Sequence, residues 1–170
     1  MKNFSISNII LGTGSYDTVL AGNRVSITGD GGNAWGYYGP AYKKLAPRLI
    51  TYTTYAEKYE ELLSLREMQE YMAMRKQIED QYIESYYETR LKELDVLELL
   101  DILQQKFGNQ TILLCHENIE EFCHRRLVAD YIELNTGVYI PEVSVSSCGV
   151  VKRENPIRYK KRLQKVISRR

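Results

Sequence analysis

The sequence predicts an α/β protein in which a parallel or mixed central sheet is flanked by helices, a Rossmann-like three-layer plan with a helical insertion and a basic C-terminal tail. Short apolar runs at 5–12, 25–27 and 111–115 have the length and composition of strands, whereas 95–106 and the segment after residue 123 have helical spacing. Strands that alternate with helices along a chain usually build a parallel sheet.

The N-terminal part predicts two short strands and a long loop. The strand at 5–12 leads into Gly12-Thr13-Gly14, and a turn-rich connection at 17–24 precedes the strand at 25–27. A strand that leads into Gly-x-Gly can bring backbone N–H groups close to a phosphate, but the full dinucleotide fingerprint is missing and a simple turn explains the pattern equally well.

Residues 28–47 interleave glycines and prolines with Trp and Tyr. This composition predicts an irregular binding loop whose rings either stack on a planar ligand or pack against the body.

The middle of the chain predicts helices. Residues 56–94 contain neither proline nor glycine, and their apolar residues recur at helical spacing, so we expect more than one helix there. Asp95 and Glu98 have the spacing of a capping box and open a further helix, which ends near Gly108.

The second half continues with a strand and a helix. The strand at 111–115 is apolar throughout, and the helix that follows it ends near Gly137, a residue that can adopt the left-handed terminating conformation. Residues 138–145 predict one more strand. Pro141 lies within it and either places it at a sheet edge or breaks it in two.

Length and composition indicate a single α/β domain over residues 1–151, with the insertion at about 56–94 and the tail at 152–170. Hydrophobic residues make up 44% and charged residues 26% of the 170 positions, as in soluble globular proteins. No apolar run is long enough for a membrane span, and Met1–Phe4 do not resemble the start of a secretion signal. Three cysteines, two of them beside His and Arg, favour a reducing compartment. We therefore expect a cytoplasmic protein.

The net charge of +1 is unevenly distributed. Residues 152–170 hold nine Lys or Arg and one Glu, a local charge of +8, so the rest of the chain carries −7. Such a tail either folds back on the protein's own acidic face, stays solvated, or binds nucleic acid or an acidic partner.

The densest group of reactive side chains lies in 111–127. Cys115, His116 and Glu117 follow the predicted strand directly, and Cys123 and His124 lie at the start of the next helix. Ligands of open α/β sheets collect beyond the carboxyl ends of strands, and a helix N-terminus favours an anion. We therefore expect both groups to line one pocket.

Three interpretations of this cluster compete. In the first, Cys123 is a nucleophile, His116 its base and Glu117 the residue that orients the base; His124 points about 100 degrees away from Cys123 on a helix and is a poorer base. In the second, the Cys and His residues hold a metal, but the spacing is not that of a zinc knuckle and Arg125 and its neighbour would repel a cation. In the third, both cysteines are small packed groups.

The preferred hypothesis is a pocket for a phosphate-bearing small molecule such as a nucleotide or nucleotide derivative, with Glu117, Cys123 and His116 as catalytic candidates. Arg125 and the helix N-terminal amides are expected to hold the anion. The full set of predicted ligand-binding residues is Ser15, Tyr16, Tyr42, Lys43, Cys115, His124 and Arg125.

We expect no metal and no cofactor. If the protein is an enzyme, it is a transferase or hydrolase; the alternatives are a protein that sequesters or senses the ligand, and one that associates with nucleic acid through its tail. A homo-oligomer is also compatible with the sequence.

The residues resemble a known family. Cys115-His116-Glu117 followed by Phe122-Cys123-His124-Arg125-Arg126-Leu127-Val128-Ala129 is similar to the signature of the domain of unknown function 488 family. Weaker agreement, in the family's order, comes from Gly14-Ser15-Tyr16, Val25-Ser26-Ile27, Tyr42–Pro47, and Tyr82 and Tyr86 ahead of Leu94-Asp95. The resemblance implies a compact α/β domain of bacterial or phage type that is suspected of nucleotide-related work. The helical stretch at 62–78 is longer than the family pattern, and the tail after Val151 is an addition to it.

Overall fold

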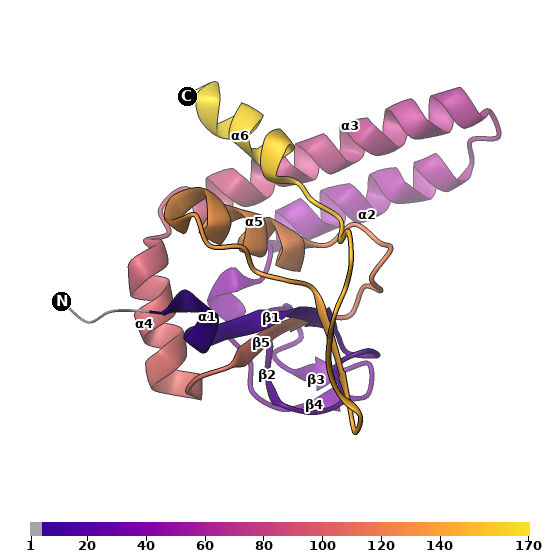
Figure 1. Cartoon of the computed structure of the whole chain (residues 1–170). Helices are drawn as coiled ribbons and strands as arrows, with labels where there is room; N and C mark the ends of the chain where they lie inside the picture. The colour runs from indigo at the N-terminus through magenta and orange to yellow at the C-terminus, as the bar shows by residue number, and fades with distance from the viewer. Residues whose placement is uncertain (1–4) are drawn as a thin grey trace.

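A three-stranded parallel sheet forms the centre of the protein (Figure 1). The computed structural model describes residues 5–170. The strands are β1 (Ile10–Ser15), β2 (Asn23–Ser26) and β5 (Thr111–Cys115), in the order β1-β5-β2. Ser15 lies opposite Cys115, and Ser26 lies opposite Leu114. The carboxyl ends of the three strands therefore meet at one edge, and the predicted parallel sheet is confirmed.

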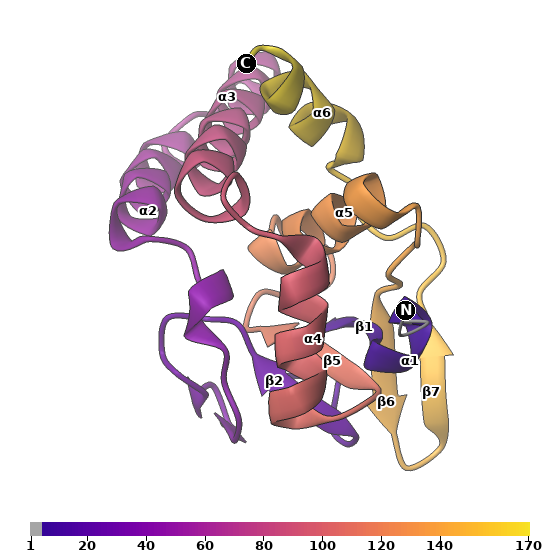
Figure 2. The same ribbon diagram turned by 90° about the vertical axis from the view of Figure 1, so that its left-hand side faces the viewer.

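Helices cover one side of this sheet. They are α1 (Ile6–Ile9), α2 (Leu49–Leu63), α3 (Met68–Tyr86), α4 (Val96–Phe107), α5 (His124–Thr136) and α6 (Lys160–Ser168), with a 3₁₀ turn η1 (Lys43–Leu45) and a π-helical turn η2 (Tyr87–Leu91). α2 and α3 form an antiparallel pair that projects beyond the sheet (Figure 1). α6 lies across α3 and α5, as both views show (Figures 1 and 2).

Two antiparallel hairpins complete the fold. β3 (Asn33–Ala34) and β4 (Tyr37–Tyr38) form a minimal pair inside the predicted irregular loop. β6 (Val143–Ser146) and β7 (Gly149–Lys152) form a hairpin beside β1 (Figure 2), with bridges from Thr13 to Glu142 and from Val19 to Val145.

The central strand separates two apolar clusters. Side chains alternate between the two faces of a strand. Leu113 and Cys115 lie in the larger cluster, with residues of α3, α4, α5 and α6. Ile112 and Leu114 lie in the smaller one, with Val19 and Val143. Helices therefore cover one face of the sheet, whereas the segment after β1 and the β6 hairpin cover the other.

The helix boundaries follow their predicted signals. The Asp95 carboxylate accepts hydrogen bonds from the backbone N–H groups of Leu97 and Glu98, at 2.9 and 3.0 Å, which caps α4. Gly108 and Gly137 both have positive φ angles where α4 and α5 end. The helical region predicted at 56–94 splits, as expected, into the end of α2, all of α3 and the π-helical turn.

Two predicted strands need correction. Residues 6–9 form a helical turn, and the first strand runs instead from Ile10 to Ser15. The reason is pairing: β5 begins at Thr111, opposite Ile10, so the residues before Ile10 have no strand beside them. Residues 138–140 are not a strand either, and the strand begins at Val143. β7 was not predicted because all four of its residues are exposed and lack an alternating apolar pattern.

The glycines after the first strand do not form a phosphate-binding loop. Gly12 and Gly14 lie within β1 and allow the chain before and in β6 to approach closely. A Cβ on Gly12 would lie 2.7 Å from the Pro141 carbonyl oxygen, and one on Gly14 would lie 2.9 Å from that of Val143. The Gly-x-Gly pattern thus serves backbone packing.

Gly14→Ala is expected to destabilise the protein by about 1–3 kcal/mol, because the added methyl group meets Val19 Cγ2 at 2.3 Å as well as a backbone carbonyl. Urea unfolding measures the loss. Gly29→Ala is the matched control: its Cβ would meet nothing within 4 Å, and its effect should stay within about 0.5 kcal/mol. Equal effects of the two substitutions would contradict the packing role.

The basic tail folds back on acidic side chains of the same chain. Arg158 bonds to Asp130 and Glu133 on α5, and Arg162 bonds to Glu79 and Asp80 on α3. This arrangement is one of the alternatives that its charge suggested. Much of the +8 charge therefore meets a partner within the fold.

No helix in residues 5–170 is long and apolar enough to cross a membrane. This finding agrees with the expectation from the hydropathy of the sequence. Residues 1–4, on which the expectation of no secretion signal partly depends, lie outside the described part of the chain.

Candidate functional site

A pocket of about 460 Å³ opens at the carboxyl edge of the sheet. Its walls are largely aromatic. The aromatic side chains that line it are Trp35 from the loop after β2, Tyr52 and Tyr55 from α2, Tyr82 from α3 and Phe122 before α5. Pockets of this size and composition bind small molecules. The expectation that residues 28–47 contribute to a ligand site therefore has a geometric basis, since six of the lining residues come from this segment.

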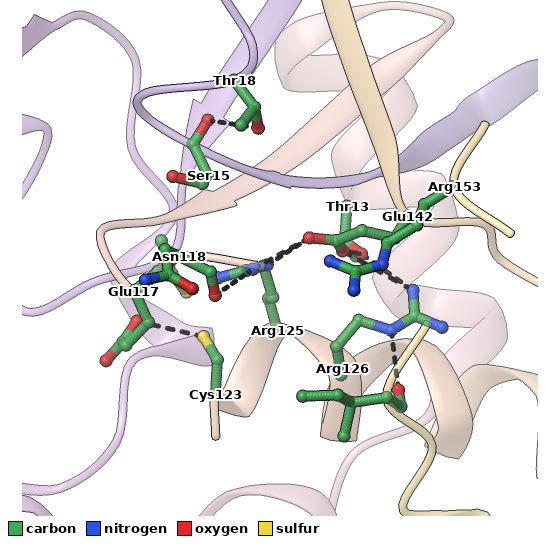
Figure 3. Close-up of polar contacts among 12 residues, drawn as sticks. Thr13, Ser15, Thr18, Glu117, Asn118, Cys123, Arg125, Arg126, Glu142 and Arg153 are labelled. Atoms are coloured by element: carbon green, nitrogen blue, oxygen red, sulfur yellow. Dashed lines mark hydrogen bonds and ion pairs between the residues drawn. The ribbon is translucent and has the colours of Figure 1, made fainter. Parts of the chain in front are cut away.

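The inner end of this pocket carries the reactive cluster. Apart from the tyrosines, the titratable lining residues are Asp30, His116, Glu117, Cys123 and His124. Cys123 is the N-cap of α5, and its thiol donates a hydrogen bond to Glu117 Oε2, with 3.0 Å between the sulfur and oxygen atoms (Figure 3). The predicted convergence of the residues after β5 with the start of α5 thus occurs in the structure.

Cys115 and His124 form the layer beneath this pair. Cys115 Sγ lies 3.6 and 3.5 Å from Nδ1 and Nε2 of His124, and it is fully buried at the end of β5. His124 Nε2 lies 2.8 Å from the carbonyl oxygen of Ile27, to which it can only donate. This bond requires a proton on Nε2, so Nδ1 is the nitrogen that carries the lone pair in the neutral ring.

The pKa values of Glu117 and Cys123, the two groups that face each other in the pocket, are shifted in opposite directions. Burial and the neighbouring charge of Cys123 raise the pKa of Glu117 to about 9. Burial opposes ionisation of Cys123, but the hydrogen bond from Cys115 and the positive charge of Arg125 together hold its pKa well below the usual range. Burial and the nearby Cys123 raise the pKa of the Cys115 thiol.

Arg125 does not face the pocket. Its guanidinium is buried and bonds to the Glu142 carboxylate through Nε at 3.0 Å and Nη2 at 2.8 Å, and to the carbonyl oxygens of Glu117 and Asn118 (Figure 3). Four of its five N–H groups are thereby used. The predicted role of Arg125 as the anion clamp needs correction: the side chain fixes the loop that carries Glu117.

Glu142 is the centre of this buried network. In addition to its bonds with Arg125, the Glu142 carboxylate accepts a hydrogen bond from Thr13 Oγ1 at 2.5 Å through Oε2. Arg126 Nη1 lies 3.9 Å from the same Oε2 atom. Arg126 also donates to Thr13 and to the Ile140 carbonyl oxygen. The network joins β1, α5 and the segment before β6, and sequence patterns did not reveal it because its members are far apart in the chain.

His116 lies at the rim of the pocket. Its ring stacks on Trp35 with 5.4 Å between centroids, and its Nε2 lies 3.5 Å from Glu117 Oε1. Burial lowers the pKa of His116. It is therefore a neutral imidazole beside Glu117, whereas Glu117, not His116, contacts Cys123.

The other predicted ligand residues do not line the pocket. Ser15 is buried at the end of β1, and Tyr42 is buried against Phe107 on α4. Tyr16 is buried too; it stacks on Tyr37, and its hydroxyl group bonds to Ser26 and Thr28. Burial raises the pKa of Tyr16 to about 12. Tyr16 therefore contributes to the site indirectly, through its hydrogen bond to the lining residue Thr28.

Several lining residues were missed at the level of sequence. Tyr52, Tyr55 and Tyr82 belong to α2 and α3, where regular helical spacing suggested ordinary packing. Only the tertiary fold brings the first turns of α2 next to the end of β5. The high tyrosine content, 14 residues, was a signal that could have marked this region, since five of them occur between Tyr52 and Tyr82.

Comparison with known proteins identifies one family. The description "Domain of unknown function DUF488" matches residues 43–132, from η1 through most of α5. The match includes α2, the two cysteines and Glu117, whereas β1, β2 and the loop bearing Trp35 precede it. Searches of curated proteins and of solved structures found no match to this chain. Because the match covers more than half of the sequence and contains the reactive cluster, the chain belongs to the DUF488 family.

Proposed function

We propose that the pocket binds a small molecule with a planar ring, most simply a nucleotide or nucleotide derivative, and presents it to Glu117 and Cys123. The observation that carries this proposal is the combination of five aromatic side chains with a thiol–carboxyl pair at the inner end of one pocket. Aromatic side chains stack on nucleobases irrespective of base identity. A polar pair at the end of an apolar pocket fixes orientation.

A phosphate group of the ligand would lie at the mouth of the pocket rather than inside it. Among the described residues, those that line the pocket include no lysine or arginine. Lys43 is exposed and lies beside Gly31, next to the lining residue Asp30. Arg48, also exposed, lies between the lining residues Pro47 and Leu49. These two cations suit a phosphate that projects from the pocket, and they replace Arg125 in that role.

The thiol–carboxyl pair suits nucleophilic chemistry with proton transfer. In the enzyme hypothesis, Cys123 passes its thiol proton to Glu117, and its sulfur forms a bond to an electrophilic atom of the ligand while the bond to the leaving group breaks. The leaving group takes the proton from Glu117, and water later releases the ligand from sulfur with Glu117 as the base. The alternative is a sensing or sequestering protein, in which the same pair only binds. Association of nucleic acid with the tail has less support, because Arg158 and Arg162 are engaged within the fold.

The fluorescence of Trp35 tests ligand binding, because it is the single tryptophan of the chain and lines the pocket. Titration with the nucleoside monophosphates is expected to quench it at saturation. Tyr52→Ala should weaken binding on the order of tenfold, the equivalent of one lost stacking contact. Tyr38→Ala is the control, since Tyr38 is also exposed but does not line the pocket. Absence of quenching, or equal weakening in both variants, would contradict the proposal.

Glu117→Gln separates the enzyme from the binding protein. Gln keeps the shape and a hydrogen bond to Cys123 but cannot transfer a proton. In the enzyme hypothesis, mass spectrometry after incubation should show a product with the wild type and none with the variant, while both quench Trp35. If the wild type leaves every bound ligand chemically unchanged, the sensing function is favoured.

A further inference from the structure

We propose that Cys115, Glu117, Cys123 and His124 form a binding site for a zinc ion. Their donor atoms, two sulfurs, one imidazole nitrogen and one carboxylate oxygen, all lie within 4.8 Å of one another. Three of the four side chains are buried, and Glu117 is partly exposed toward the pocket. Zinc in proteins prefers four ligands of these types.

The donor atoms lie close enough for tetrahedral coordination once two of the side chains turn. Bond lengths of about 2.3 Å for Zn–S and about 2.0 Å for Zn–N imply a separation of about 3.5 Å between the sulfur and nitrogen ligands. Cys115 Sγ lies 3.6 Å from His124 Nδ1 but also 3.5 Å from Nε2, so the sulfur lies over the imidazole ring, and the ring must turn before Nδ1 and Cys115 can share one ion. The separation of 3.0 Å between Cys123 Sγ and Glu117 Oε2 is about 0.5 Å shorter than a tetrahedral S···O pair requires. A small rotation of the Glu117 side chain, which is 23% exposed, corrects it.

The residues around the cluster orient the ligands. His124 Nε2 donates to the carbonyl oxygen of Ile27, so Nδ1 is left with its lone pair for a metal. Zinc-binding histidines commonly donate their second N–H to a carbonyl group in this way. Arg125 holds the carbonyl oxygens of Glu117 and Asn118 and thereby fixes the loop that carries the Glu117 ligand.

The structure also changes the charge argument against a metal. From sequence alone, the arginines beside Cys123 and His124 were expected to repel a cation. Arg125 is instead paired with Glu142 at 2.8 Å, and Arg126 points to Thr13 and Ile140. Binding of zinc would release the thiol protons of Cys115 and Cys123 to solvent, so two thiolates would face the ion.

The pocket gives the ion a route to solvent. Glu117, Cys123 and His124 line the pocket, whereas Cys115 lies behind them. The most exposed ligand, Glu117, is therefore the one that a water molecule or a ligand in the pocket could replace. This inference does not depend on the proposed function. The two compete for one sulfur, however, because a Cys123 that binds zinc cannot attack a substrate.

Cobalt and zinc titrations of the full-length, chelator-treated and reduced protein test the site. One equivalent of Co²⁺ should produce a thiolate-to-cobalt charge-transfer band and the visible bands of tetrahedral cobalt, and Zn²⁺ should abolish both. Cys123→Ser and Cys115→Ser should each weaken binding by ~100-fold or more, since loss of groups that merely support a ligand already costs 10–100-fold. Cys148→Ser, which removes the exposed third cysteine, should leave binding unchanged.

Alkylation of the wild type provides a readout that needs no variant. Mass spectrometry should show that Zn²⁺ slows the reaction of iodoacetamide with Cys123, which lines the pocket, and leaves Cys148 reactive. The inference is overturned if cobalt gives no charge-transfer band, if Zn²⁺ does not slow the alkylation of Cys123, or if the Cys115 and Cys123 variants bind as tightly as the wild type. Failure of zinc binding together with Trp35 quenching by nucleotides would leave the proposed function standing alone.

Discussion

Glu142→Gln is expected to lower the free energy of unfolding by about 3 kcal/mol, a large fraction of the stability of a domain of this size. The Glu142 carboxylate is 2% exposed and accepts hydrogen bonds from Arg125 and Thr13. Glutamine keeps the volume but removes the charge, which leaves the buried Arg125 guanidinium without its counter-ion. Breaking one partner of a buried ion pair is costly for this reason.

Urea unfolding followed by circular dichroism measures this loss. Glu154→Gln is the control, because Glu154 is exposed in the connection that follows β7. We expect the control to change the stability by less than about 0.5 kcal/mol. Equal stability of the two variants would show that the ion pair does not hold β1, α5 and the β6 segment together. Since Arg125 also holds the Glu117 carbonyl oxygen, Glu142→Gln should additionally weaken the Trp35 response to ligand.

Asp130→Asn is expected to destabilise the protein by about 3 kcal/mol and to loosen α6 more than the rest of the fold. Asp130 is fully buried on α5, and its carboxylate accepts hydrogen bonds from Arg158 Nε at 2.7 Å and from the backbone N–H of Tyr159 at 2.6 Å. Asparagine removes the charge and places an N–H group opposite one of these donors. The start of α6 then loses its attachment to α5.

Amide hydrogen exchange can localise this effect. Residues 159–168 should exchange faster in the Asp130→Asn variant than in the wild type, whereas α4 should lose protection only with global unfolding. Glu84→Gln is the control because Glu84 and its partner Arg170 are both about half exposed, and exposed pairs contribute less than about 1 kcal/mol. Unchanged exchange in α6 would mean that apolar contacts alone hold it on α3 and α5.

Local patterns predicted the local structure well. The cap at Asp95, the glycine at 137 and the apolar run at 111–115 act through neighbours in the chain, and each appears in the structure as expected. The strand at 5–12 was wrong in its boundaries because its extent depends on where β5 begins. Pairing between distant strands leaves no signal in either segment alone.

The sequence by itself determined which reactive groups this protein contains. It also determined that they lie at the end of a strand and at the start of a helix, because hydrophobic periodicity and capping are properties of short segments. Only the tertiary structure decided what those groups do. It turned Arg125 inward to Glu142, brought Glu117 against Cys123, and placed tyrosines of α2 and α3 in front of both. The physical reason is that a buried charge must find a counter-charge, and Glu142 lies 17 positions further along the chain, in a segment that meets Arg125 only after folding.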